Sequence, residues 1–167
     1  MVTAHRRESF GVDIENIAYA LREIAHCLPH IHIIYPLHLN PNIQIPMREI
    51  LGNTRNIHLI EPLGYEKFVY LMHKSHIILT DSGGIQEEAT YLHKPTLVLR
   101  NKTERKEALA CKTLRLIGTD KENIIKHTLA LFCDEKLYKK MSNPKNPLFF
   151  GDGNSAKKIV HFIKKLT

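Results

Sequence analysis

The sequence lacks the features that mark membrane, secreted and metal-binding proteins. No apolar run approaches the ~20 residues that a membrane-spanning helix needs, and charged residues at positions 5–8 interrupt the start of the chain, so no signal peptide is expected. The three cysteines are widely spaced and odd in number, which argues against a disulfide framework. Eleven histidines are scattered, and no pair at i, i+4 lies beside a carboxylate ligand. We therefore expect a cytoplasmic protein that neither enters a membrane nor binds a metal ion.

Signatures of nucleic-acid binding and of several enzyme classes are also missing. The sequence has no basic run interleaved with aromatics, no finger spacing and no RNA-binding signature, so nucleic acid is not expected as a partner. It has no nucleophile elbow, no Walker lysine after its paired glycines and no complete dinucleotide fingerprint. The formal net charge of +7 and the pI of about 9.3 still favour a small anionic partner, such as a nucleotide or phosphate.

Strand-like and helix-like patterns alternate over the 167 residues, a length sufficient for one domain with a core. Short β-rich apolar runs predict strands at 1–4, 31–35, 57–60, 76–80, 96–99 and 113–117. Asp120 is expected to cap a helix, and helical spacing of apolar residues predicts further helices at 14–28, 46–51, 65–74, 85–92, 105–110, 135–141 and 156–166. This alternation predicts an α/β fold, a three-layer Rossmann-like domain whose parallel strands are joined by right-handed crossovers.

The segment from Leu79 to Ala89 is the one around which the chain is organised. An apolar run ends abruptly at Asp81–Gly84, a pattern typical of a buried strand that enters a helix through a tight turn. Unpaired N–H groups at a helix N-terminus can hold a phosphate, and glycines let a ligand approach the backbone. Glu88, one turn into the helix, can reach a ribose hydroxyl. The alternative is that Asp81 or Ser82 is a plain N-cap.

Polar groups follow four of the predicted strands. They are His5-Arg6-Arg7, His38-Leu39-Asn40, Asp81-Ser82-Gly83-Gly84 and Thr103-Glu104-Arg105. In an open parallel sheet, ligands bind outside the carboxyl ends of the strands. The fold therefore brings these distant groups to one rim, and their convergence favours a nucleotide or sugar-phosphate site over an isolated N-cap.

Several rim residues allow two interpretations from the sequence alone. The position of His5, at a strand end beside two arginines, favours a ligand role over a surface turn. Arg6 is either a solvated charge or a bidentate phosphate ligand. His38, in a proline-rich loop, fits a structural role and a functional role equally. Arg105 can pair with a glutamate on its own helix, and composition favours a core position for Phe68.

Six motifs occur together and in order along the chain. They are Thr3-Ala4-His5-Arg6-Arg7-Glu8-Ser9-Phe10-Gly11, Tyr35-Pro36-Leu37-His38-Leu39-Asn40-Pro41, Phe68-Val69-Tyr70-Leu71-Met72, Leu79 to Ala89, Thr103-Glu104-Arg105 and Gly151-Asp152-Gly153. Each motif is moderately specific, whereas the ordered set is highly specific. The set resembles the C-terminal half of the bacterial non-hydrolysing UDP-N-acetylglucosamine 2-epimerases, over nearly the whole chain.

The resemblance implies a GT-B architecture, in which residues 1–167 form the UDP-binding C-terminal domain and the active site lies between two Rossmann-like domains. It implies interconversion of UDP-N-acetylglucosamine and UDP-N-acetylmannosamine through elimination and re-addition of UDP, without a metal or nicotinamide cofactor. The implied UDP ligands are His5, Phe68, Ser82, Gly83, Gly84, Glu88 and Arg105. His5 is also the implied catalytic residue, and Arg6 and His38 match positions at which a second substrate molecule binds as an activator.

The chain also departs from the family pattern. The family's N-terminal domain, which supplies the acidic acid/base residues, has no counterpart here, and Lys106 replaces a usual proline. We therefore expect a nucleotide-binding half that is inactive without a separately encoded N-terminal half. The alternatives are a non-catalytic UDP-sugar binding module, a degenerate remnant, and half of a deoxy-sugar UDP 2-epimerase for surface polysaccharides. The resemblance implies a UDP-sugar as ligand and a homo-oligomer for the full-length family, which is typically dimeric. A lone half would expose the apolar wall of a cleft between domains, so self-association or aggregation is expected of it.

Overall fold

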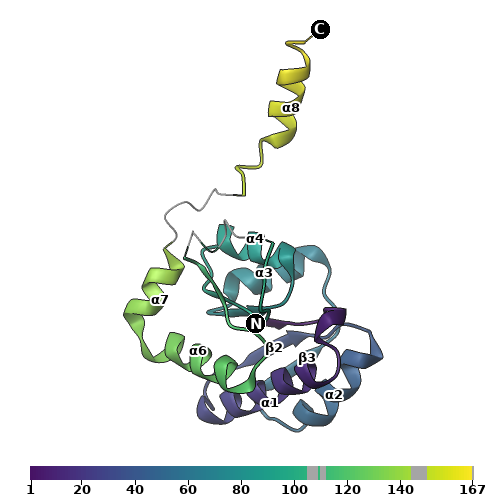
Figure 1. Cartoon of the computed structure of the whole chain (residues 1–167), viewed down its shortest axis with the longest axis vertical. Helices are drawn as coiled ribbons and strands as arrows, with labels where there is room; N and C mark the ends of the chain where they lie inside the picture. Colours follow the sequence, from purple (N-terminus) through teal and green to yellow (C-terminus); the bar gives the residue numbers. More distant parts are fainter. Residues whose placement is uncertain (105–108, 110–111, 144–149, 167) are drawn as a thin grey trace.

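The computed structural model of the chain describes residues 1–104, 109, 112–143 and 150–166. Helices and strands alternate within one body, and the last helix, α8 (Ser155–Ile163), stands away from it (Figure 1). This arrangement confirms the predicted α/β fold. No helix in the described part of the chain is long and apolar enough to cross a membrane.

The six strands in the described part of the chain are parallel, and they form two sheets. The larger sheet has the order β1 (Val2–Thr3), β4 (Ile78–Thr80), β5 (Thr96–Val98) and β6 (Leu114–Leu116), and the smaller pairs β2 (Ile33–Pro36) with β3 (Ile57–Ile60). Because β2 lies against β1, the spatial succession is 3-2-1-4-5-6, the Rossmann order.

The parallel strands divide into two sheets between β1 and β2. A cavity lined by Val2 and Ile33 separates the two strands where they begin, and Pro36 has no N–H to donate to a ladder. Where they end, the buried hydroxyl of Tyr35 donates to the carbonyl of Ala4 at 2.6 Å. A side-chain contact thus joins the sheets in place of ladder hydrogen bonds.

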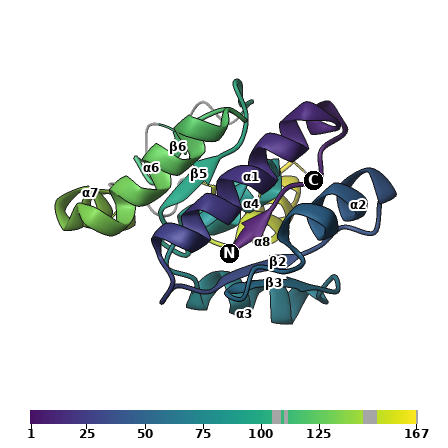
Figure 2. The same ribbon diagram turned by 90° about the horizontal axis from the view of Figure 1, so that it is seen from below.

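Helices cover both faces of the sheets and give the predicted three layers (Figure 2). The remaining helices are α1 (Val12–Cys27), α2 (Pro41–Leu51), α3 (Tyr65–Lys74), α4 (Gly83–Tyr91), α6 (Lys121–Cys133), α7 (Glu135–Ser142) and the short 3₁₀ helix η1 (Arg7–Ser9). Strand β4 shows how the layers arise, because side chains alternate between faces along a strand. Leu79 joins the large core under α1, α2 and α6, whereas Ile78 packs with Met72 of α3 and Ala89 of α4.

Most predicted elements lie within a few residues of their observed positions, and α2 is the main correction. The sequence predicts a helix at 46–51, but α2 begins at Pro41, with Pro46 inside it. Asn40 caps this earlier start, since its side chain accepts the amide of Asn42 at 2.9 Å, and proline suits the first helical position. The helix predicted at 105–110 falls on residues that, except for Leu109, lie outside the described part of the chain.

Helix α8 differs from its prediction in what it exposes. The sequence predicts a terminal helix with lysines on its exposed face, and the structure also exposes its apolar side chains. They are Ile159, Val160, Phe162, Ile163 and, just beyond the helix, Leu166. A surface of this kind is typical of a segment that packs against another chain or domain.

Asn56 fixes the path of the chain between α1 and the smaller sheet. Its buried side-chain amide donates to the carbonyls of Ala25, Leu28 and Ile31 at 3.0, 3.3 and 2.9 Å. These oxygens lie where α1 ends and the chain enters β2, so one side chain satisfies acceptors that the helix leaves unpaired.

Replacement of Asn56 tests this role. Asn56→Ala is expected to lower the free energy of unfolding by about 2–3 kcal/mol, because buried carbonyls lose their donor, and urea unfolding measures the change. The control is Asn53→Ala at an exposed position nearby, where a change within about 0.5 kcal/mol is expected. Equal stability of the two variants would contradict the role given to Asn56.

Candidate functional site

A pocket of about 190 Å³ lies at the carboxyl ends of β1, β2, β3 and β4. Its walls are Thr3, His5, Pro36, His38, Pro62, Leu63, Phe68, Ser82 and Ile85. The strand ends thus bring four of the predicted site residues, His5, His38, Phe68 and Ser82, to one place. These residues lie up to 77 positions apart in the chain, and the predicted parallel sheet accounts for their convergence.

The turn after β4 presents the amino end of α4 to this pocket. Ser82 is the N-cap residue, and its side chain makes no capping hydrogen bond. Its own amide donates to the hydroxyl of Thr80 at 3.0 Å, whereas the first amides of any helix have no intrahelical acceptor. A Cβ built on Gly84 would meet no atom within 4 Å, so the space above the turn is open to a ligand.

Asp81 serves a different purpose from the predicted alternative of a plain N-cap. Its side chain is fully buried, and Oδ2 accepts the backbone amides of His5 and Arg6, each at 2.8 Å. The turn after β4 therefore holds the turn after β1. The register of the two strands, in which Thr3 lies beside Thr80, makes this short connection possible.

The imidazole rings of His5 and His38 stack on one another. Their centroids are 5.3 Å apart and their planes differ by 12°. His38 is held in place by the amide of Asn40, which donates to Nδ1 at 3.1 Å, and the hydroxyl of Thr3 lies 3.4 Å from Nδ1 of His5. The resemblance assigns His5 to UDP and His38 to an activating second substrate molecule. In the structure both rings lie on one wall of the pocket.

Phe68 and Glu88 flank the turn from the helices behind it. Phe68 packs against the core formed by Met72, Ile78 and Ala89, as composition predicts, and it also lines the pocket. Oε2 of Glu88 is buried without a hydrogen-bond partner among the described residues. Burial, with a smaller contribution from Glu87, raises the pKa of the Glu88 carboxyl. Buried polar atoms normally have partners, so this oxygen is available to a ligand.

A cluster of ion pairs lies around Arg100, which follows β5, and the sequence did not predict it. The largely buried side chain of Arg100 lies 3.1 Å from Glu8 and donates twice to Glu104, both at 3.2 Å. Arg100 directly follows a predicted strand, so the strand-end rule could have found it. Arg6 lies 3.3 Å from the same Glu8 carboxylate, whereas Arg105 falls outside the described residues.

Gln86 is a second residue that the sequence did not reveal. Its fully buried side chain donates to the carbonyl of Ser82 at 3.2 Å and accepts the hydroxyl of Thr103 at 2.9 Å. It therefore ties the segment after β5 to the turn after β4. A buried amide in a short helix gives no distinctive pattern in the sequence.

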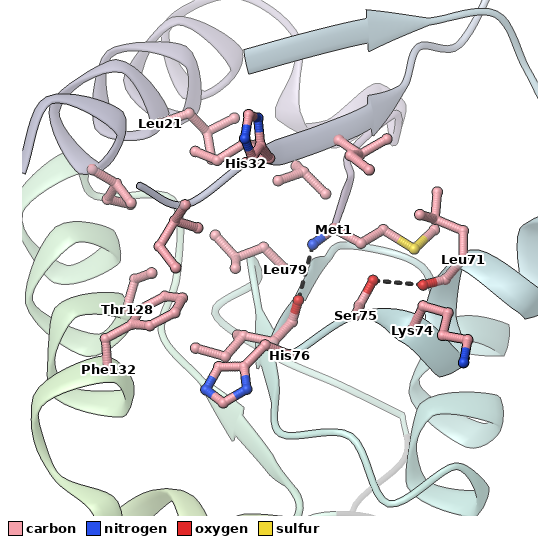
Figure 3. A pocket seen from close by; sticks show the side chains of 16 residues that line it. Met1, Leu21, His32, Leu71, Lys74, Ser75, His76, Leu79, Thr128 and Phe132 are labelled. Atoms are coloured by element: carbon pink, nitrogen blue, oxygen red, sulfur yellow. Dashed lines mark hydrogen bonds between the residues drawn. The ribbon is translucent and has the colours of Figure 1, made fainter. Parts of the chain in front are cut away.

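A separate cavity of about 200 Å³ lies at the opposite, amino ends of the strands (Figure 3). Its walls are mainly aliphatic, and none of the predicted site residues lines it. The amino group of Met1 donates to the carbonyl of Ile77 at 3.0 Å, and its burial lowers its pKa to about 5. No cluster of three or more potential metal ligands occurs among the described side chains of the molecule.

Comparison with known proteins shows the family of the chain. The profile of the family described as UDP-N-acetylglucosamine 2-epimerase matches residues 1–164. The chain belongs to this family. Among curated relatives, the UDP-N-acetylglucosamine 2-epimerase of Escherichia coli K12 is 49% identical over 164 residues, which are 98% of this chain and 43% of that protein. The chain thus spans less than half the length of the epimerases that it matches.

Solved epimerase structures have the same fold. The UDP-GlcNAc 2-epimerase of Neisseria meningitidis, bound to UDP-GlcNAc, is 50% identical, with a TM-score of 0.93 over 98% of this chain and 44% of that one. The S. aureus MnaA–UDP structure is 45% identical, with a TM-score of 0.92 over the same 98% and 44%. The glycosyltransferase of kitacinnamycin, at 13% identity and a TM-score of 0.65, shares the fold alone. These matches confirm the predicted GT-B type of domain.

The pairing of Arg100 with Glu104 leads to a prediction about the pKa of Glu104, which NMR titration can test. A side-chain hydrogen bond from Arg100 is the largest of the causes that lower the pKa of the Glu104 carboxyl from 4.5 to about 2. The ionised pair therefore stabilises the fold at neutral pH, and the contribution is lost as the pH falls from 4.5 towards 2. In Arg100→Gln, carboxyl ¹³C NMR should find the Glu104 pKa shifted back towards 4.5.

The exposed Lys102 provides a matched control for that titration. Lys102→Gln removes the same charge from the same segment and should leave the pKa of Glu104 low. A low Glu104 pKa in Arg100→Gln would show that Arg100 is not its cause.

Proposed function

We propose that this chain is the UDP-binding portion of a UDP-N-acetylglucosamine 2-epimerase and holds UDP as the leaving group. The observation that carries the proposal is the convergence of Ser82, His5 and Phe68 around one pocket at the strand ends, beside the amino end of α4. The relatives whose structures contain UDP-GlcNAc or UDP support the choice of ligand.

The chemistry of the rim suits a nucleoside diphosphate. The positive end of α4 and its unpaired amides face the position of a diphosphate and stabilise the negative charge that UDP gains as it leaves. Ser82, Gly83 and Gly84 hold the diphosphate, Phe68 borders the uracil and Glu88 accepts from the ribose. His5 lies beside the diphosphate and close to the reacting bond, and Arg105 is assigned to the nucleotide by its sequence motif alone.

The reaction also needs groups that the rim does not supply. When UDP is eliminated, the bond between the sugar C1 and the diphosphate breaks and a proton leaves C2, and both are restored on the other face. None of the described side chains that line the pocket is a carboxylate. We propose that acid/base carboxylates come from the part of the enzyme that these residues do not cover, and that Arg6 and His38 face an activating second substrate molecule.

Substitution of Glu88 tests the nucleotide site. Glu88→Gln is expected to weaken UDP binding about tenfold, because a neutral amide accepts ribose hydroxyls less strongly than a carboxylate, and calorimetry measures the change. Burial raises the Glu88 pKa, so the folded state disfavours the ionised carboxyl and its neutralisation should not unfold the protein. The neighbouring Glu87→Gln is the control and should retain full affinity. UDP binding equal in both variants would contradict the role of Glu88.

A chimera tests the enzymatic part of the proposal. The chain is joined to the part of the Neisseria meningitidis epimerase that it does not match, and the ratio of UDP-N-acetylglucosamine to UDP-N-acetylmannosamine is followed by NMR. We expect interconversion, and its loss in His5→Ala, because the rim would then meet the missing acid/base groups. A folded chimera that binds UDP yet never converts the substrate would favour a non-catalytic UDP-sugar binding module.

A further inference from the structure

One buried oxygen in the rim has no explanation in the contacts of the folded chain. Oδ2 of Asp81 accepts two backbone amides, whereas Oδ1 is buried and has no hydrogen-bond partner among the described residues. A buried carboxylate oxygen without a donor is costly. Nδ1 of the His5 imidazole lies 4.0 Å from this oxygen.

Among the described residues, His5 carries the basic side chain that lies within 4.0 Å of this oxygen. The Asp81 side chain is fully buried, and its other oxygen is anchored by the very backbone that carries His5. Nδ1 of His5 now lies 3.4 Å from the hydroxyl of Thr3, a long contact. A small rotation of the partly exposed ring would replace that contact with a charge-assisted hydrogen bond to Oδ1, which is the stronger interaction.

We propose that Asp81 is a positioning residue for His5, whose Nδ1–H it accepts, so that Nε2 is the unprotonated nitrogen available to a ligand. The partner of one ring nitrogen determines the protonation of the other. Because the same carboxylate also holds the backbone of His5, the orientation of the ring and its tautomer are set together. The use of Nε2 in the reaction rests on the proposed function, whereas the tautomer itself does not.

Side-chain ¹⁵N NMR of the unliganded chain tests the proposal at about pH 8.5, where imidazoles are predominantly neutral. The His5 signals are assigned by their loss in His5→Gln. In the wild-type protein we expect the proton on Nδ1. Asp81→Asn keeps an oxygen for the two backbone amides and presents an NH₂ group to the ring, so the proton should move to Nε2. Thr3→Val removes the other neighbour and should leave the proton on Nδ1.

Two results would overturn the proposal. One is a wild-type His5 that carries its proton on Nε2, an outcome that needs no variant to fold. The other is an Asp81→Asn protein with a folded amide spectrum and an unchanged tautomer, since a purely structural aspartate would give that result. The experiment contains no UDP, so a failure of nucleotide binding would leave it unaffected.

Discussion

Two hydrogen bonds from the amides of His5 and Arg6 to one oxygen of Asp81 hold the candidate site together. They join the turn that follows β1 to the turn that follows β4, and they place a histidine over the amino end of α4. Both turns are short, so neither would keep this position alone. Strand pairing between β1 and β4 brings the turns within reach, and the buried carboxylate fixes them there.

The candidate site contains buried acidic groups although the chain as a whole is basic. The net charge is +7, yet Asp81 and Glu88 each bury a carboxylate oxygen beside the turn that is expected to hold a diphosphate. Arg100 is occupied by Glu8 and Glu104. Among the described residues of the turn after β4, the partial positive charge comes from backbone amides at the amino end of α4. Such a site binds an anion through fixed dipoles, which need little reorganisation as charge develops on a leaving group.

The sequence predicts the site at the strand ends because that site depends on local strand patterns and on the order of the strands. Alternating patterns predict parallel strands, parallel strands put their ends at one edge, and His5, His38 and Ser82 each follow a strand. The features that the sequence does not predict depend on contacts between side chains that lie far apart in the chain. Neither the pairing of Arg100 with Glu8 nor the separation of β2 from β1 has a sequence pattern. The sequence predicts helix α2 too short because Pro46 suits the first position of a helix, although Asn40 and Pro41 provide an earlier and stronger start.

Backbone amide NMR tests the central claim, that the turn at the amino end of α4 holds the diphosphate of UDP. Titrations with UDP and with uridine are compared on the same labelled chain. The account predicts that UDP shifts the amides of Ser82, Gly83 and Gly84 strongly, and that uridine leaves them nearly unchanged while both ligands affect Phe68. Equal shifts of these three amides with uridine, or UDP shifts confined to the apolar cavity beside Met1, would contradict it.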